Sequence, residues 1–152
     1  MELIGGLWTE PGLPLLFVLS FLAATLVPIG SEWLLILLIV QDYPVHQVVM
    51  TATLGNYLGA CTSFLLGIAG STFMISKVLR INSEQMARAE RMYRRYGIWS
   101  LLLSWLPLVG DPICLVAGMF RIRFIPFSIL VFLGKFCRYA TLALLVLSRS
   151  GG

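Results

Sequence analysis

Positive charge is absent from the first half of this 152-residue chain. Residues 1–76 contain no Lys or Arg, and the first cation is Lys77. Charged residues make up only 12% of the chain and apolar residues make up 59%, whereas a soluble domain has about 25% and 45–50% of these classes. The composition therefore excludes an ordinary water-soluble globule. Because a helical crossing needs about 20 residues, the chain has room for only a few membrane spans.

Groups that bind metals or carry out catalysis are also scarce. There is one histidine, His46, and the three cysteines lie in apolar segments without a C-x-x-C spacing: Cys61, Cys114 and Cys137. A zinc or iron–sulfur site is therefore not expected. The sequence also has no G-x-S-x-G motif, no glycine-rich phosphate loop and no nucleophile with a partnered base. We predict a protein that is not an enzyme and that uses no metal and no cofactor.

The cations that do occur begin with a dense cluster in residues 77–95, namely Lys77, Arg80, Arg88, Arg91, Arg94 and Arg95. Short loops rich in Lys and Arg stay on the cytoplasmic side of a membrane, so we predict that this segment is cytoplasmic. Within it, apolar residues recur at helical spacing over residues 81–96, which predicts an interfacial helix whose arginines face lipid headgroups. An adjacent bilayer explains this charge better than a nucleic acid does, so we expect no nucleic-acid partner.

Several apolar segments are too short, or too interrupted, to be simple spans. Residues 33–40 cover only about 12 Å as a helix, against a hydrocarbon core of about 30 Å. Residues 47–76 and 124–148 are long enough to cross. Two other apolar regions are interrupted by proline and glycine, at Pro28 and Gly30 and at Pro107, Gly110 and Pro112.

The two interrupted regions resemble one another. VPIGSEWLLIL, residues 27–37, and LPLVGDPICLV, residues 106–116, share proline, glycine and an acid in the same order, and Pro28 and Pro107 are 79 residues apart. Such paired interruptions are typical of inverted repeats whose half-membrane helices meet near the midplane. We predict an all-α integral membrane protein of one domain, residues 1–152. Its two inverted repeats, about 11–76 and 96–148, would each contain a re-entrant helical hairpin followed by a transmembrane helix, with the basic linker helix between them. The alternative is that residues 11–40 form one full span plus an interfacial segment, which would move the N-terminus to the other side.

Charged residues inside the apolar segments are the candidate functional groups. Glu32 and Asp111 lie at the two interruptions, and such residues usually mark ion, proton or substrate paths. Desolvation favours the protonated carboxyl group, so both acids are candidates for proton exchange. Lys135 and Arg138 lie too deep in the last span to reach water easily, so we expect them to pair with an acid or to hold an anionic headgroup. Purely structural ion pairs that hold the hairpins together are the alternative.

Small and polar residues share one stretch of the first long span. Gly55 and Gly59 have the G-x-x-x-G spacing that lets another helix approach closely. Asn56 lies between them. We interpret the glycines as helix-packing residues, and for Asn56 both a packing role and a substrate contact stay open.

Four segments of the chain resemble a known family, in order and over about residues 15–145. They are LSFLAATLVPIGSEWLLI, TATLGNYLGACTSFLLG, RRYGIWSLLLSWLPLVGDPICLVAGMFRI and LGKFCRYATLALL. They look like the YqaA-like branch of the DedA family, whose members are also called SNARE-associated or VTT-domain proteins. The resemblance implies an inner-membrane protein with two facing re-entrant hairpins. It also implies a role like that of family members implicated in moving undecaprenyl phosphate or phospholipids between leaflets and in proton-dependent envelope homeostasis.

The resemblance extends to single residues, with one departure. Glu32 matches the family's membrane-embedded glutamate, and Asn56 stands where typical members have an aspartate. Ser104 and Asp111 fall where those members carry two arginines, so this chain offers an acid in place of a cation. We expect that Arg121, Arg123 or Arg138 supplies the missing positive charge.

Together these features predict a membrane transporter or lipid translocase that moves an anionic lipid or lipid carrier between leaflets with proton coupling. We expect a homo-oligomer, because the chain is too short for a large transporter fold unless it dimerises. Glu32, Asn56, Asp111 and Lys135 would line the path, and Arg138, with Arg121 or Arg123, would attract the phosphate. Two alternatives stay open. One is a structural or assembly factor that transports nothing, and the other is a proton or small-ion antiporter.

Overall fold

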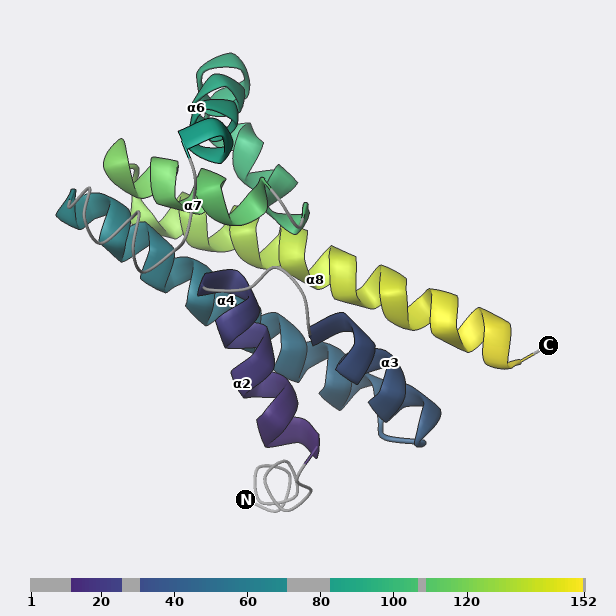
Figure 1. The fold of residues 1–152 in the computed structure, drawn as a ribbon. Helices are drawn as coiled ribbons and strands as arrows, with labels where there is room; N and C mark the ends of the chain where they lie inside the picture. Colours follow the sequence, from purple (N-terminus) through teal and green to yellow (C-terminus); the bar gives the residue numbers. More distant parts are fainter. Residues whose placement is uncertain (1–11, 26–30, 71–82, 107–108, 152) are drawn as a thin grey trace.

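The computed structural model describes residues 12–25, 31–70, 83–106 and 109–151, and this part of the chain consists of helices joined by short turns (Figure 1). The helices are α2 (Gly12–Thr25), α3 (Ser31–Val40), α4 (Val45–Ala69), α6 (Ser83–Tyr96), the 3₁₀ helix η1 (Gly97–Trp105), α7 (Gly110–Met119) and α8 (Phe124–Ser150). Within the described ranges, α4 and α8 are long and apolar enough to cross a membrane, and α2, α3 and α7 are shorter apolar helices. The all-helical prediction is confirmed, and this pattern suits a helical membrane protein.

Helices α4 and α8 run in opposite directions beside each other and form the axis of the structure (Figure 1). Helix α4 also contacts α2 and α7, and helix α8 also contacts η1 and α3. Helix α4 therefore packs against α2 from its own half of the chain and α7 from the other half. Helix α8 packs against η1 from its own half and α3 from the other half. The two halves of the sequence are interlocked rather than placed side by side.

Glycines bring α4 close to α2. A Cβ atom on Gly55 would lie 2.5 Å from the carbonyl oxygen of Phe17, and one on Gly59 would lie 2.6 Å from that of Phe21. Any side chain at these positions would push the helices apart. The G-x-x-x-G spacing thus lies in the contact between α4 and α2.

A second glycine contact joins α4 to α7. A Cβ atom on Gly67 would collide with the carbonyl oxygen of Leu115, and one on Gly118 would collide with that of Phe64. Phe64 is buried and stacks on Phe127 of α8, with ring centroids 4.2 Å apart. Backbone contact and aromatic packing therefore fix α7 between the two long helices.

The interruptions fall only partly where the sequence suggested. Pro28, Gly30 and Pro107 lie outside the described residues. Gly110 and Pro112 lie inside α7, in its first turn, so they begin the second short helix and do not form the break itself. Proline is tolerated there because the first N–H groups of a helix have no partner within the helix.

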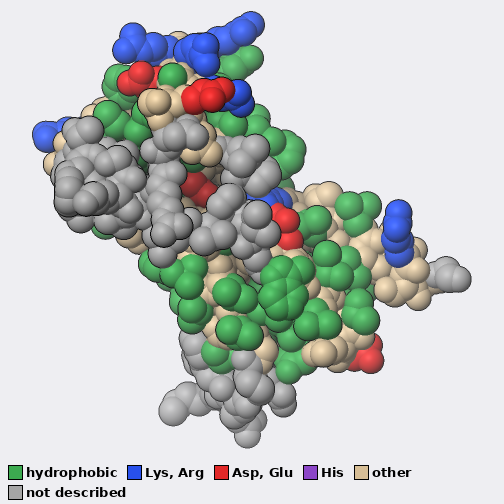
Figure 2. Space-filling model, viewed as in Figure 1, with side chains coloured by type: hydrophobic (Ala, Val, Ile, Leu, Met, Phe, Trp, Pro, Cys, Tyr) green, Lys and Arg blue, Asp and Glu red, His purple; other side chains and the backbone are tan. Residues whose placement is uncertain are grey.

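Helix α6 is amphipathic and covers one end of the structure. Ala89 is buried, and Tyr93 stacks on Phe120 with ring centroids 4.9 Å apart. Burial raises the pKa of the Tyr93 phenol. Figure 2 shows basic side chains gathered over this helix at the top of the molecule, and Arg88 pairs with Glu84 at 2.7 Å on its exposed face. The predicted helix over residues 81–96 is present as α6.

Candidate functional site

Two cations of α8 reach the first turns of the two short helices that follow the interruptions. Lys135 Nζ lies 3.2 Å from Asp111 Oδ1, at the start of α7, and Arg138 forms an ion pair with Glu32, at the start of α3. The positive end of a helix dipole favours a carboxylate at both places. Because Lys135 and Arg138 are three residues apart, they project from neighbouring positions on α8. One stretch of α8 therefore holds both short helices.

The pair formed by Lys135 is buried and fully committed to protein partners. Only 2% of the Lys135 side chain is exposed, and its ammonium group also donates to Asn56 Oδ1. An ammonium group can only donate, so the amide oxygen of Asn56 must face it. The amide nitrogen of Asn56 then donates to the Tyr139 hydroxyl at 3.0 Å, and that hydroxyl shares a hydrogen bond of 3.0 Å with Ser31 Oγ. This chain of contacts connects α7 to α3 through the interior.

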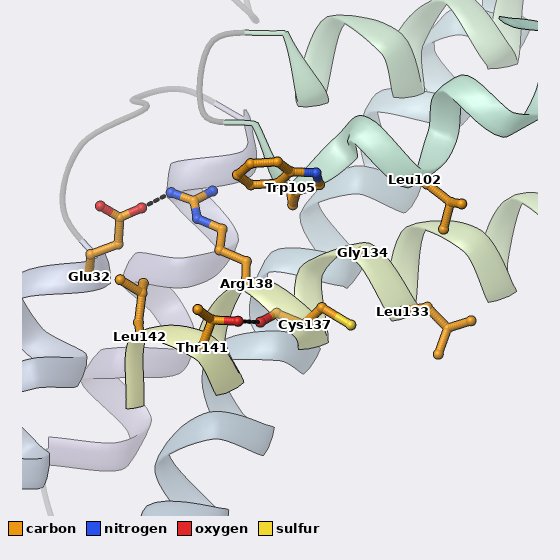
Figure 3. A pocket seen from close by; sticks show the side chains of 9 residues that line it. All are labelled: Glu32, Leu102, Trp105, Leu133, Gly134, Cys137, Arg138, Thr141 and Leu142. Carbon is orange, nitrogen blue, oxygen red and sulfur yellow. Dashed lines mark hydrogen bonds and ion pairs between the residues drawn. The ribbon is translucent and has the colours of Figure 1, made fainter. Parts of the chain in front are cut away.

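The pair formed by Arg138 borders a groove. The exposed fraction is 15% for the Arg138 side chain and 42% for Glu32. The groove has a volume of about 720 Å³ and is lined by Glu32, Leu102, Trp105, Leu133, Gly134, Cys137, Arg138, Thr141 and Leu142. Figure 3 shows Glu32 and Arg138 pointing toward each other at one end of it, near Trp105, with Leu102 and Leu133 toward the other end.

Few other polar groups of the groove are available to a ligand. Thr141 donates its hydroxyl to the carbonyl oxygen of Cys137 at 2.7 Å, within its own helix. The guanidinium of Arg138 also lies over the ring of Tyr139, 5.8 Å from its centroid, a cation–π contact that helps to hold it. Among the described residues that line the groove, Arg138 is the cation and Glu32 the anion. The groove is thus a mostly apolar surface with one charged end.

The structure separates the remaining candidate cations from this site. Arg121 lies in the turn between α7 and α8 with a φ of 51°, Arg123 is the residue before α8, and both are exposed. Fifteen residues of helix separate Arg123 from Arg138, which is about 22 Å along the axis. The expectation that Arg121 or Arg123 joins Arg138 does not agree with this geometry. Asp111 also does not line the groove.

Four residues near the site have roles that the sequence analysis did not predict. Tyr139 and Ser31 share a hydrogen bond in the interior, and Trp105 lines the groove, yet no pattern in the sequence pointed to them. Ser104 is buried beside Gly134, and its hydroxyl has no hydrogen-bond partner among the described residues. All of them matter through tertiary contacts that spacing along the chain does not reveal.

Comparisons with known proteins find matches that cover most of the chain. A family model described as VTT domain matches residues 11–148. The chain is 42% identical over 129 residues to "Inner membrane protein YqaA" of Escherichia coli (strain K12), which covers 84% of this chain and 86% of the relative. The protein of the same name from Shigella flexneri gives the same figures. An "Uncharacterized protein" of Haemophilus influenzae is 34% identical over 146 residues, covering 91% of this chain and 89% of the relative. No solved structure matches.

Proposed function

Because this chain belongs to the VTT-domain family, in its YqaA-like branch, we propose that it is an inner-membrane protein that moves an anionic lipid or lipid carrier between leaflets. The substrate class is that of undecaprenyl phosphate or a phospholipid. The name of the Escherichia coli relative supports the inner-membrane location. Residues 77–95 would lie on the cytoplasmic side, because Lys and Arg are retained there.

The contacts support two inverted repeats with re-entrant hairpins. Asn56 and Lys135 are 79 residues apart, as Pro28 and Pro107 are, and they contact each other. Two equivalent positions can contact each other only near the axis that relates the two repeats. The antiparallel course of α4 and α8 agrees with an axis in the membrane plane. Helices α3 and α7 have 10 residues each, or about 15 Å, half of the hydrocarbon thickness.

The observation that carries the proposed function is the ion pair between Glu32 and Arg138 at one end of an apolar groove. A lipid with a phosphate group has the matching distribution, one anionic end and an apolar remainder. A guanidinium binds phosphate through two parallel hydrogen bonds. Along the groove, Leu102, Leu133 and Leu142 offer apolar surface to the chain of the lipid.

Proton coupling in this proposal acts through Glu32. Protonation of its carboxylate removes the negative charge that faces Arg138, so the guanidinium becomes available to a phosphate. Asp111 lies off the groove and keeps Lys135 as its partner. Of the two acids, only Glu32 is therefore placed to exchange a proton during transport.

A lipid-movement assay tests this function. The purified protein is reconstituted into liposomes that contain a fluorescent phosphatidylglycerol, and loss of fluorescence to a membrane-impermeant reductant reports arrival in the outer leaflet. We expect Arg138→Ala to slow this movement by about tenfold or more, because a charge-assisted hydrogen bond is worth about 1.5–3 kcal/mol. Glu32→Gln should remove the pH dependence of the rate. Movement at the wild-type rate by both variants, each with a normal unfolding temperature, would show that the proposed path is wrong.

The second candidate function is a structural or assembly role without transport. The contacts among Asp111, Lys135, Asn56 and Tyr139 favour it, because they join α4, α7 and α8 and commit the ammonium of Lys135 to protein partners. This role predicts that Glu32→Gln lowers the unfolding temperature. Transport predicts changed activity at unchanged stability.

A further inference from the structure

The two ion pairs of α8 differ in a way that assigns them different roles. The ammonium of Lys135 has two protein acceptors, Asp111 and Asn56, and almost no exposed surface. Arg138 has Glu32 as its carboxylate partner, and 42% of the Glu32 side chain is exposed. The carboxylate of Glu32 borders the groove and can leave its partner, whereas Asp111, 23% exposed, lies off the groove and faces an ammonium with almost no exposed surface. The pair at the groove is therefore exchangeable and the interior pair is fixed.

Arg138 is the group in the groove that can bind an anion, and the carboxylate of Glu32 already pairs with it. The guanidinium of Arg138 is the donor at the charged end, and the Thr141 hydroxyl is used within its own helix. A carboxylate and a phosphate group each offer two oxygens that fit the planar guanidinium fork. A lipid phosphate that binds Arg138 must displace the carboxylate of Glu32.

Resting on the function proposed above, we propose that Glu32 is an internal place-holder for the headgroup phosphate of an anionic lipid. Its carboxylate binds Arg138 when the groove is empty and swings away when the lipid arrives. This makes Glu32 a competitor of the substrate, so its removal strengthens binding. A residue that helped to hold the headgroup would have the opposite effect. Tighter binding after loss of a site residue is the signature of the place-holder.

Quenching of Trp105 fluorescence measures this binding, because Trp105 lines the groove. The assay uses a variant of the whole chain in which the other three tryptophans are replaced by phenylalanine, so that only Trp105 fluoresces. The variant is placed in detergent micelles. The probe is phosphatidylglycerol with brominated acyl chains, and phosphatidylcholine with the same chains is the control lipid. Quenching as a function of lipid mole fraction gives the apparent affinity for each headgroup.

We expect Glu32→Gln and Glu32→Ala to bind the phosphatidylglycerol about two- to fivefold more tightly, the range expected when a partly exposed ion pair no longer has to be broken. Arg138→Gln should remove the preference for phosphatidylglycerol over phosphatidylcholine, and Arg138→Lys should keep part of it. Glu84→Gln is the matched control, because it breaks an exposed Glu–Arg pair on α6, away from the groove, and should leave affinity unchanged.

Unchanged or weaker binding by both Glu32 variants, with unfolding temperatures like that of the wild type, overturns the place-holder. Preserved headgroup preference in Arg138→Gln overturns it as well. Tighter binding by the Glu32 variants combined with no lipid movement by the wild type keeps the place-holder and refutes translocation. Lipid movement by the wild type without tighter binding by the variants refutes the place-holder alone.

Discussion

Because Lys135 is buried, we expect the loss of its partner Asp111 to destabilise the protein. In Asp111→Asn, the ammonium of Lys135 stays 2% exposed and keeps Asn56 as a partner, but it loses the charge that compensates it. Removing one partner of a buried pair costs about 3–5 kcal/mol. Because 23% of the Asp111 side chain is exposed, we expect the lower end of that range, about 3 kcal/mol. For a chain of this size that lowers the unfolding temperature by about 6–12 °C.

The assay is thermal unfolding of the purified protein in detergent, and a double-mutant cycle isolates the pair. Asp111→Asn with Lys135→Met removes both charges, so most of the stability should return. Glu84→Gln is the control, because its pair with Arg88 is exposed and should be worth about 1 kcal/mol or less. If Asp111→Asn unfolds at the temperature of this control, or if the two substitutions are simply additive, the pair is not the internal brace that the burial implies.

Two further predictions concern packing and the interior hydrogen bonds. Gly118→Ala should destabilise the protein by about 2 kcal/mol or more, because the new methyl group collides with the backbone of Phe64; a wild-type unfolding temperature would contradict the close contact. Tyr139→Phe removes the hydroxyl shared by Ser31 and Asn56, which should cost about 1–3 kcal/mol because a buried amide donor loses its acceptor. The same thermal assay measures it, and an unchanged value would show that water or another group replaces the hydroxyl.

The helices and their lengths could be predicted from sequence because they follow from local composition. Long apolar runs predicted the spans that became α4 and α8, and the amphipathic period predicted α6. The 3₁₀ form of η1 was not predictable, because its residues also suit an α-helix and the tighter winding comes from its packing. The first turn of α7 likewise begins at Gly110, so glycine and proline marked the region of the break without marking its exact boundary.

The need of two buried cations for partners was predictable, and the identity of those partners was not. The free-energy cost of burying a charge was enough to predict that Lys135 and Arg138 need anionic partners. Which acid meets which cation depends on the rotation of α8 against the two short helices. That rotation is set by contacts such as the close approach of Gly134 to η1, where a Cβ atom would lie 3.0 Å from the carbonyl oxygen of Leu102. No pattern within a single segment carries this information.

The proposed repeats, offset by 79 residues, would account for the difference that we infer between the two ion pairs. This offset matches Asn56 with Lys135, which contact each other, so the interior network would lie where the proposed repeats meet. It places Arg138 opposite Gly59, which is packed so closely on α2 that a Cβ atom would lie 2.6 Å from the carbonyl oxygen of Phe21. At Gly59 there is therefore no room for a side chain, whereas the matching position in the second half carries a guanidinium. The proposed headgroup site would therefore be asymmetric even if the framework that holds it is repeated, because only the second half carries the charged side chain of the groove.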